Sequence, residues 1–221
     1  MKRAMLMVAV VLVAAGAARG GVITFRLVEE FSGGIAIPPA GTVPPAWLTV
    51  TIDDGVDDSD GIVTLTLAAT NLTGSEKVSE WCLNLDPVFN PKNLVFSSPV
   101  TVGTFKDPSI STGTDAYKAD GDGKYDILFA FDHTGSTLKN FGAGESIQYT
   151  VTLSSGGTLT AASFDFLSAP AGGHGPYPTA AHVLGIGTDA KSGWVTTPEP
   201  ATLVLMGAGL AGLLVRRRRA A

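Results

Sequence analysis

The middle of the chain alternates apolar and polar residues with a period of two. Residues 46–52 read AWLTVTI and residues 62–70 read IVTLTLAAT, so apolar side chains share one side of each run and threonines the other. Similar alternation occurs in residues 80–86, 125–132 and 146–154. A period of two with β-branched and aromatic residues is the pattern of half-buried β-strands.

Short segments rich in glycine, aspartate and proline separate these runs, for example DDGVDDSDG and ADGDGK. Such residues favour turns, because glycine tolerates positive φ angles and proline fixes φ. No run of ten or more residues in this region has the 3.6-residue period of an amphipathic helix. We therefore predict an all-β fold, with residues 21–196 forming one antiparallel β-sandwich of jelly-roll-like type.

The first twenty residues have a different pattern. Lys2 and Arg3 precede an apolar stretch at residues 4–15, and the small residues AGAARGG follow it. This order is typical of a secretory signal peptide, and the apolar stretch is too short for a membrane span, which needs roughly 20 residues. We predict that residues 1–20 are a signal peptide and that the protein is exported through the inner membrane.

The chain ends in a second apolar segment with unusual flanks. Pro198, Glu199 and Pro200 precede the uncharged residues 201–215, and four arginines follow at Arg216, Arg217, Arg218 and Arg219. As an α-helix the uncharged run would be about 22 Å long, against a hydrocarbon core of about 30 Å. The arginines would remain on the cytoplasmic side. The segment therefore fits either a short membrane anchor or a sorting signal that is removed by a protease.

This combination of Pro198, Glu199 and Pro200, an apolar helix and an arginine cluster resembles the PEP-CTERM sorting signal of Gram-negative bacteria. The resemblance covers residues 197–221 and implies recognition by an exosortase, a membrane cysteine transpeptidase. It also implies export with exopolysaccharide, and a destination at the cell surface or in a biofilm matrix. A second resemblance lies in residues 71–87, 118–132 and 163–183, which are similar to a subgroup of such proteins with a β-rich body. This second resemblance does not indicate a substrate.

The body between the two ends is strongly acidic and has one cysteine. Nineteen acidic and eight basic side chains lie in residues 21–198, which gives a net charge of −11. Such a body repels the phosphate backbone of nucleic acids and attracts divalent cations. Cys82 is the sole cysteine of the chain, so there is no internal disulfide. It alternates with strand residues, which favours a small buried side chain over a reactive thiol.

A cluster of aspartates is the candidate metal site. Asp120, Asp122 and Asp126 lie in DGDGKYD, with glycines between the first two and after the second. Calcium prefers six to eight oxygen ligands, and a tight loop with alternating aspartates can supply several of them. The loop lacks the glutamate at position 12 of an EF-hand. The alternatives are a calcium site, with Ca²⁺ as the candidate cofactor, and a polar hairpin turn.

Aromatic residues suggest a second kind of site. Trp194 and Tyr177 lie in glycine-rich surroundings, so we expect them to be exposed and able to stack on sugars. Trp81 alternates with leucines, which places it in the core.

The histidines do not have the spacing of a known catalytic or zinc motif. The chain contains neither H-E-x-x-H nor G-x-S-x-G, although a catalytic pairing of His174 or His182 with a distant residue stays open. We predict a non-enzymatic surface or matrix protein. The alternatives are a glycan-binding module and a secreted hydrolase.

Overall fold

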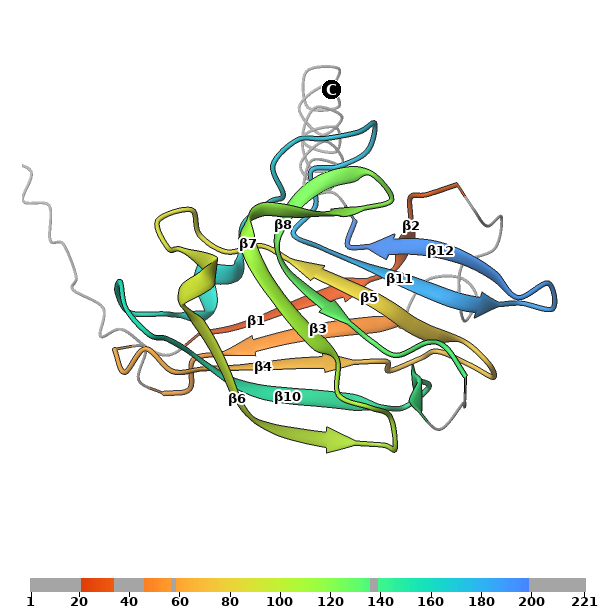
Figure 1. The fold of residues 1–221 in the computed structure, drawn as a ribbon, viewed down its shortest axis with the longest axis horizontal. Coiled ribbons are helices and arrows are strands. Elements are labelled where there is room, and N and C mark those ends of the chain that lie inside the picture. Colours follow the sequence, from red (N-terminus) through yellow and green to blue (C-terminus); the bar gives the residue numbers. More distant parts are fainter. Residues whose placement is uncertain (1–20, 34–45, 57–58, 136–138, 199–221) are drawn as a thin grey trace, which may run out of the picture.

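The computed structural model describes residues 21–33, 46–56, 59–135 and 139–198, which form two antiparallel β-sheets. Sheet A has the order β1 (Val22–Leu27), β3 (Leu48–Asp53), β4 (Val63–Ala68), β10 (Ser146–Leu153), β6 (Leu94–Val102). Sheet B has the order β2 (Glu29–Glu30), β12 (Lys191–Thr196), β11 (Thr179–Ile186), β5 (Lys77–Leu83), β8 (Asp122–Ala130), β7 (Ser109–Ala119), with β9 (Phe141–Gly142) on β5. Figure 1 shows the two layers.

The prediction of an all-β fold with antiparallel strands is confirmed, because every strand pair is antiparallel. Two 3₁₀ turns, η1 (Pro91–Asn93) and η3 (Ala161–Phe164), complete the described elements. The likeness to a jelly roll stays a prediction. The predicted signal peptide and the apolar run at residues 201–215 lie outside the described residues. Within the described ranges, no helix is long and apolar enough to cross a membrane.

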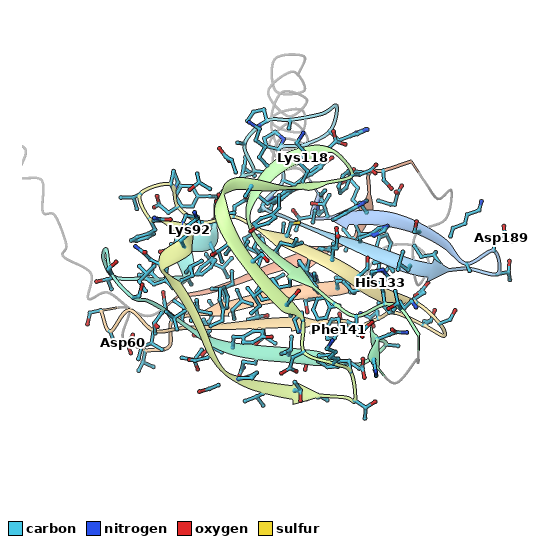
Figure 2. The ribbon with its side chains drawn as sticks, in the orientation of Figure 1. Asp60, Lys92, Lys118, His133, Phe141 and Asp189 are labelled. Atoms are coloured by element: carbon cyan, nitrogen blue, oxygen red, sulfur yellow. The ribbon has the colours of Figure 1, made fainter. Side chains whose placement is uncertain are left out.

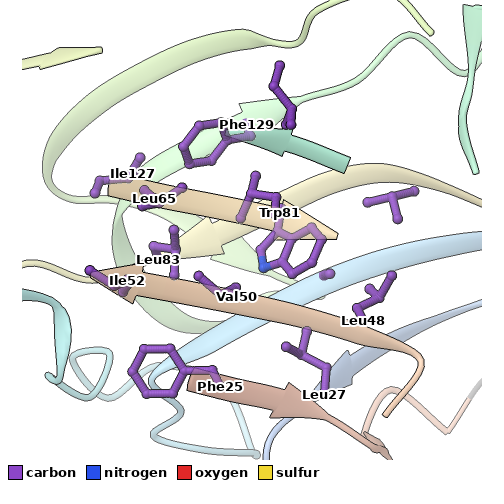
Figure 3. Packing of buried hydrophobic residues seen from close by; sticks show 14 of the residues in the cluster. Phe25, Leu27, Leu48, Val50, Ile52, Leu65, Trp81, Leu83, Ile127 and Phe129 are labelled. Carbon is purple, nitrogen blue, oxygen red and sulfur yellow. The ribbon is translucent and has the colours of Figure 1, made fainter. Parts of the chain in front are cut away.

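One hydrophobic core lies between the sheets. Sheet A contributes Leu48, Val50, Ile52 and Leu65, and sheet B contributes Trp81, Leu83, Ile127 and Phe129, all fully buried (Figure 3). Burying a side chain of this size stabilises the fold by about 1.5–3 kcal/mol. The indole nitrogen of Trp81 donates to Thr179 Oγ1 at 3.0 Å, so the polar atom of this ring is satisfied. The predicted core position of Trp81 is confirmed.

The outward face of sheet A consists largely of threonines. Thr51 of β3 pairs with Thr66 of β4, which pairs with Gln148 of β10. Gln148 Nε2 donates to Thr66 Oγ1 at 3.2 Å across the strands. Threonine suits such positions, because its branched side chain fits a pleated sheet surface and its hydroxyl remains in contact with water.

The outward face of sheet B is covered by a second hydrophobic cluster. We call this group the outer cluster; it consists of Phe31, Cys82, Ala119, Tyr125, Tyr177, Ala180 and Trp194. Cys82 is fully buried there, and burial raises the pKa of its thiol. The interpretation of Cys82 as a small buried side chain is therefore confirmed.

Candidate functional site

The aspartate segment forms the turn between β7 and β8. Ala119 pairs with Asp122, so Asp120 and Gly121 are the two residues of the hairpin loop, with φ angles of 53° and 83°. Positive φ at both central residues is the type I′ turn, which favours the sequence Asp-Gly. The structure thus has the hairpin turn that was one of the two interpretations of this segment.

The carboxylate of Asp122 holds a loop that is distant in the sequence. Its Oδ1 accepts hydrogen bonds from the backbone nitrogens of Gly173 and His174, at 2.5 and 3.1 Å. Asp122 is buried, and the backbone of Gly172 packs directly against the carboxylate. The side chain therefore ties the loop before β11 to the start of β8.

Asp126 has the same role at another place. Oδ2 accepts from the backbone nitrogen of Leu85 at 3.0 Å, and Oδ1 accepts from that of Asp115 at 2.9 Å. Burial raises the pKa of Asp126, while the two backbone hydrogen bonds lower it in part. The carboxylate thus joins the end of β5 to the middle of β7.

The three predicted metal ligands are therefore not brought together as a ligand set. The oxygens of Asp122 and Asp126 bind backbone nitrogens of different segments, and Asp120 lies in the turn. Among the described residues, no group of three or more His, Cys, Asp or Glu side chains is arranged to hold a metal ion. Calcium binding through these aspartates stays a prediction.

The expected exposure of Trp194 and Tyr177 is wrong, since their exposed fractions are 7% and 4%. The Trp194 ring stacks on His182 with centroids 4.9 Å apart, and the Tyr177 ring lies 4.8 Å from that of Phe31. Each ring packs within or against the outer cluster because the opposite face of sheet B is already filled by the core. Sugar binding by these two residues stays a prediction that their burial does not favour.

His182 contacts a serine, a pairing that the sequence left open without identifying the partner. Ser79 Oγ lies 2.9 Å from His182 Nδ1, although the two residues are far apart in the chain. Ser79 is buried on β5, where the pairing with β11 shifts register between His182 and Val183. Burial lowers the pKa of His182, and the charge of Asp120 offsets part of this effect. The contact holds the His182 imidazole against the Trp194 ring. Ser79 itself is buried in sheet B.

A groove lies beside η1, and we call it the η1 groove. It consists of two adjoining hollows of about 710 and 220 Å³ that share Pro87, Phe89 and Thr114. The first is also lined by Asn90, Lys92, Thr112 and Ala116, and the second by Asn84, Asp115, Asp126 and Leu167. Figure 2 labels Lys92, the middle residue of η1.

A wide bulge in β7 forms one wall of the η1 groove. Thr112 pairs with Ile127 and Tyr117 with Tyr125, so four β7 residues lie opposite Asp126 alone. Asp115, at the tip of this bulge, has a φ of 52°. The Asp126 carboxylate holds the backbone nitrogen of Asp115 in that conformation.

The other wall is the segment between β5 and η1. The same Asp126 carboxylate binds Leu85, Asp86 Oδ1 accepts from the nitrogen of Val88 at 2.9 Å, and Asn90 Oδ1 accepts from that of Lys92 at 3.1 Å. Both walls are thus fixed before any ligand arrives, which lowers the cost of ordering on binding.

The η1 groove combines apolar and polar surface. Phe89 is half-buried, and Val88 is 73% exposed at the rim. Thr112 and Thr114 line the groove with them, together with the ionisable residues Lys92, Asp115 and Asp126. An aromatic ring among hydroxyl and charged groups suits an uncharged or weakly charged polar ligand. Sequence reasoning missed this site because the β7 bulge has no periodic pattern.

The predicted sorting determinant begins where the fold ends. Thr196, the last residue of β12, pairs with Ala180 on one side and Glu29 on the other. Its Oγ1 donates to the carbonyl of Thr179 at 2.6 Å, and its carbonyl accepts from the nitrogen of Val28 at 2.9 Å. Pro198 is the last described residue. Glu199, Pro200 and the arginines at positions 216, 217, 218 and 219 lie outside the described residues.

Comparison with protein families identifies the C-terminal segment. Residues 196–219 match the PEP-CTERM protein-sorting motif. The resemblance seen in the sequence is therefore confirmed for this segment, and the motif implies export, membrane-associated sorting and processing by an exosortase. No curated protein and no solved structure matches the chain.

Proposed function

We propose that this chain, whose C-terminal segment is a PEP-CTERM sorting motif, is a non-enzymatic protein of the cell surface or of an exopolysaccharide-containing extracellular matrix. The observation that carries the proposal is the position of the motif, directly after an acidic all-β body. Residues 1–20 would direct export as a signal peptide, and residues 201–215 would anchor the chain transiently before an exosortase processes it.

Mass spectrometry of the mature protein tests this proposal. In cells that contain the exosortase, we expect the exported protein to lack its C-terminal segment, and in cells without the enzyme we expect that segment to be retained. An intact Ala221 on exported protein from exosortase-positive cells would contradict sorting and favour a permanent anchor.

A second candidate function is glycan binding, and the η1 groove is the observation that favours it. Retention on columns of immobilised exopolysaccharide measures this binding. Phe89→Ala would remove the aromatic surface, and Thr114→Val would remove a hydroxyl at nearly constant shape. We expect both variants to lose retention, with Thr66→Val on the outward face of sheet A as the matched control. Equal retention of all three variants would remove the groove as the site.

Calcium stabilisation is a further proposal, supported by the acidic composition of the body rather than by the placement of Asp120, Asp122 and Asp126. If calcium binds the folded state, millimolar calcium raises the Tm by mass action. The control is the same measurement on Asp120→Asn. An unchanged Tm of the unaltered body would contradict the proposal.

A hydrolase function is the least favoured alternative. Its support is the contact between Ser79 and His182. A catalytic serine must reach a substrate, whereas Ser79 is 3% exposed. Ester hydrolysis by the purified body that disappears in Ser79→Ala would favour an enzyme over our proposal.

A further inference from the structure

Thr196 has two roles in this chain. It is the last residue of β12 and the first residue of the matched sorting motif. Its exposed fraction is 0%, and it is paired with a strand on each side. Thr197, which follows it, has an exposed fraction of 9%. The fold therefore encloses the residues that lead into Pro-Glu-Pro.

This enclosure matters because a processing enzyme must hold its substrate. Extended peptides are commonly bound through backbone hydrogen bonds, in the manner of an added β-strand. Pro198 and Pro200 have no backbone N–H group to offer. The nearest backbone N–H groups before Glu199 belong to Thr197 and Thr196, and Thr196 is paired with β2 and β11.

The short distance to the apolar run adds a second constraint. Three residues, Pro198, Glu199 and Pro200, separate Thr197 from that run. Fully extended, they span about 10 Å. When residues 201–215 lie in the membrane, the folded body must lie close to the membrane surface. An enzyme in the same membrane then meets the motif at the junction with β12, without a free linker.

We propose that processing by the exosortase requires Thr196 to leave sheet B and the buried Thr197 to become exposed with it, so that the stability of the end of β12 sets the rate of processing. The inference rests on the proposed function, because it assumes that an exosortase acts on this chain. It adds that the substrate of the enzyme is a locally opened form of the body. Local opening at strand ends is a common low-energy fluctuation of folded proteins.

A linker insertion tests the proposal most directly. Gly-Ser-Gly-Ser inserted between Thr197 and Pro198 would separate Pro-Glu-Pro from the fold. In a pulse–chase experiment on the full chain in exosortase-positive cells, we expect the C-terminal segment to be lost at least about fivefold faster. The control is the same insertion between Thr188 and Asp189, in the exposed turn before β12, which should leave the rate unchanged.

A point substitution tests the hydrogen bond of the strand end. Thr196→Val keeps the branched shape and removes the donor to the carbonyl of Thr179. Loss of one such hydrogen bond raises the open population by roughly fivefold, and processing should accelerate by a similar factor. Val151→Ala on β10 weakens the core far from β12 and is the control for overall destabilisation, since it should leave the processing rate unchanged.

A reversible crosslink gives the opposite test. Glu29 and Thr196 are paired residues of β2 and β12, so Glu29→Cys with Thr196→Cys can form a disulfide in an oxidising compartment. We expect the oxidised double variant to remain unprocessed and to be processed after reduction, whereas each single cysteine variant is processed without reductant. The inference would be overturned by equal processing rates in four proteins: the unaltered chain, the linker variant, Thr196→Val and the oxidised double variant. Absence of processing in every chain, the unaltered one included, would instead overturn the proposed function.

Discussion

The outward faces of the two sheets differ in what covers them. On sheet A, β3 and β4 alternate strictly between buried apolar residues and half-exposed residues, most of which are threonines. On sheet B, the central strand β5 has buried residues on both faces, because Trp81 points to the core and Cys82 to the outer cluster. What covers the outward face of a strand therefore determines its sequence pattern. A strand with one face in water alternates apolar and polar residues, whereas a strand buried on both faces need not alternate.

The largest difference between the two faces should appear when a covering side chain is removed. Tyr177→Ala takes a buried aromatic ring out of the outer cluster and should lower the free energy of unfolding by about 3 kcal/mol or more. Gln148→Ala, on the outward face of sheet A, should change it by less than about 0.5 kcal/mol. Urea unfolding measures both. Similar values for the two variants would mean that the outer cluster does not stabilise the fold.

A second test concerns the loop that Asp122 ties down beside the outer cluster. Gly172 has a φ of +70°, and an added Cβ would lie 1.7 Å from Asp122 Oδ1. Gly172→Ala should therefore cost about 2–3 kcal/mol, from the strained backbone and the weakened hydrogen bonds to Asp122.

Gly173→Ala is the matched control for that substitution, because nothing lies within 4 Å of its added Cβ. The same unfolding experiment should show the control close to the unaltered protein. Equal destabilisation by the two alanines would show that the close approach to Asp122 is not the cause.

The pH dependence of stability tests the role of Asp126, a residue of β8 in sheet B. Because burial raises the pKa of Asp126, the folded state holds this proton more tightly than the unfolded state does. The free energy of unfolding should therefore fall as the pH rises from below the usual aspartate value through the raised pKa. Urea unfolding at several pH values measures the slope, which should be smaller in Asp126→Asn. An unchanged slope in that variant would contradict the assignment.

The smallest expected effect on the free energy of unfolding comes from His182, and its pH dependence has the opposite sign to that of Asp126. Its pKa is lowered below 6.5 by burial, so the unfolded state binds the proton more readily. This part of the stability should decrease as the pH falls through 6.5 and the lowered pKa, and His182→Gln should remove it. A titration followed by NMR measures the pKa of the imidazole, and a value above 6.5 would contradict the burial argument.

Much of the fold follows from alternation in the sequence. The runs at residues 46–52 and 62–70 predict β3 and β4 because one face of sheet A contacts water. The Asp-Gly pair at Asp120 also predicts its turn, since few residues accept positive φ twice in succession.

The candidate site was harder to predict. Trp194 and Tyr177 have glycine-rich neighbours, which suggested exposure, but the outer cluster that buries them is assembled from Phe31, Cys82 and other residues distant in sequence. The η1 groove depends on a bulge and on the two hydrogen bonds of Asp126. Neither leaves a periodic signal, because both depend on contacts between segments that are far apart in the chain.

The buried position of Cys82 allows chemical labelling to report whether the folded body is intact. The residue lies on β5, between β8 and β11, in the middle of sheet B. Its side chain lies in the outer cluster, so a thiol-specific reagent can reach it only when that cluster opens. The labelling rate therefore measures how often the cluster opens. Because the chain has one cysteine, a single added mass per molecule would record such an event without any engineered label.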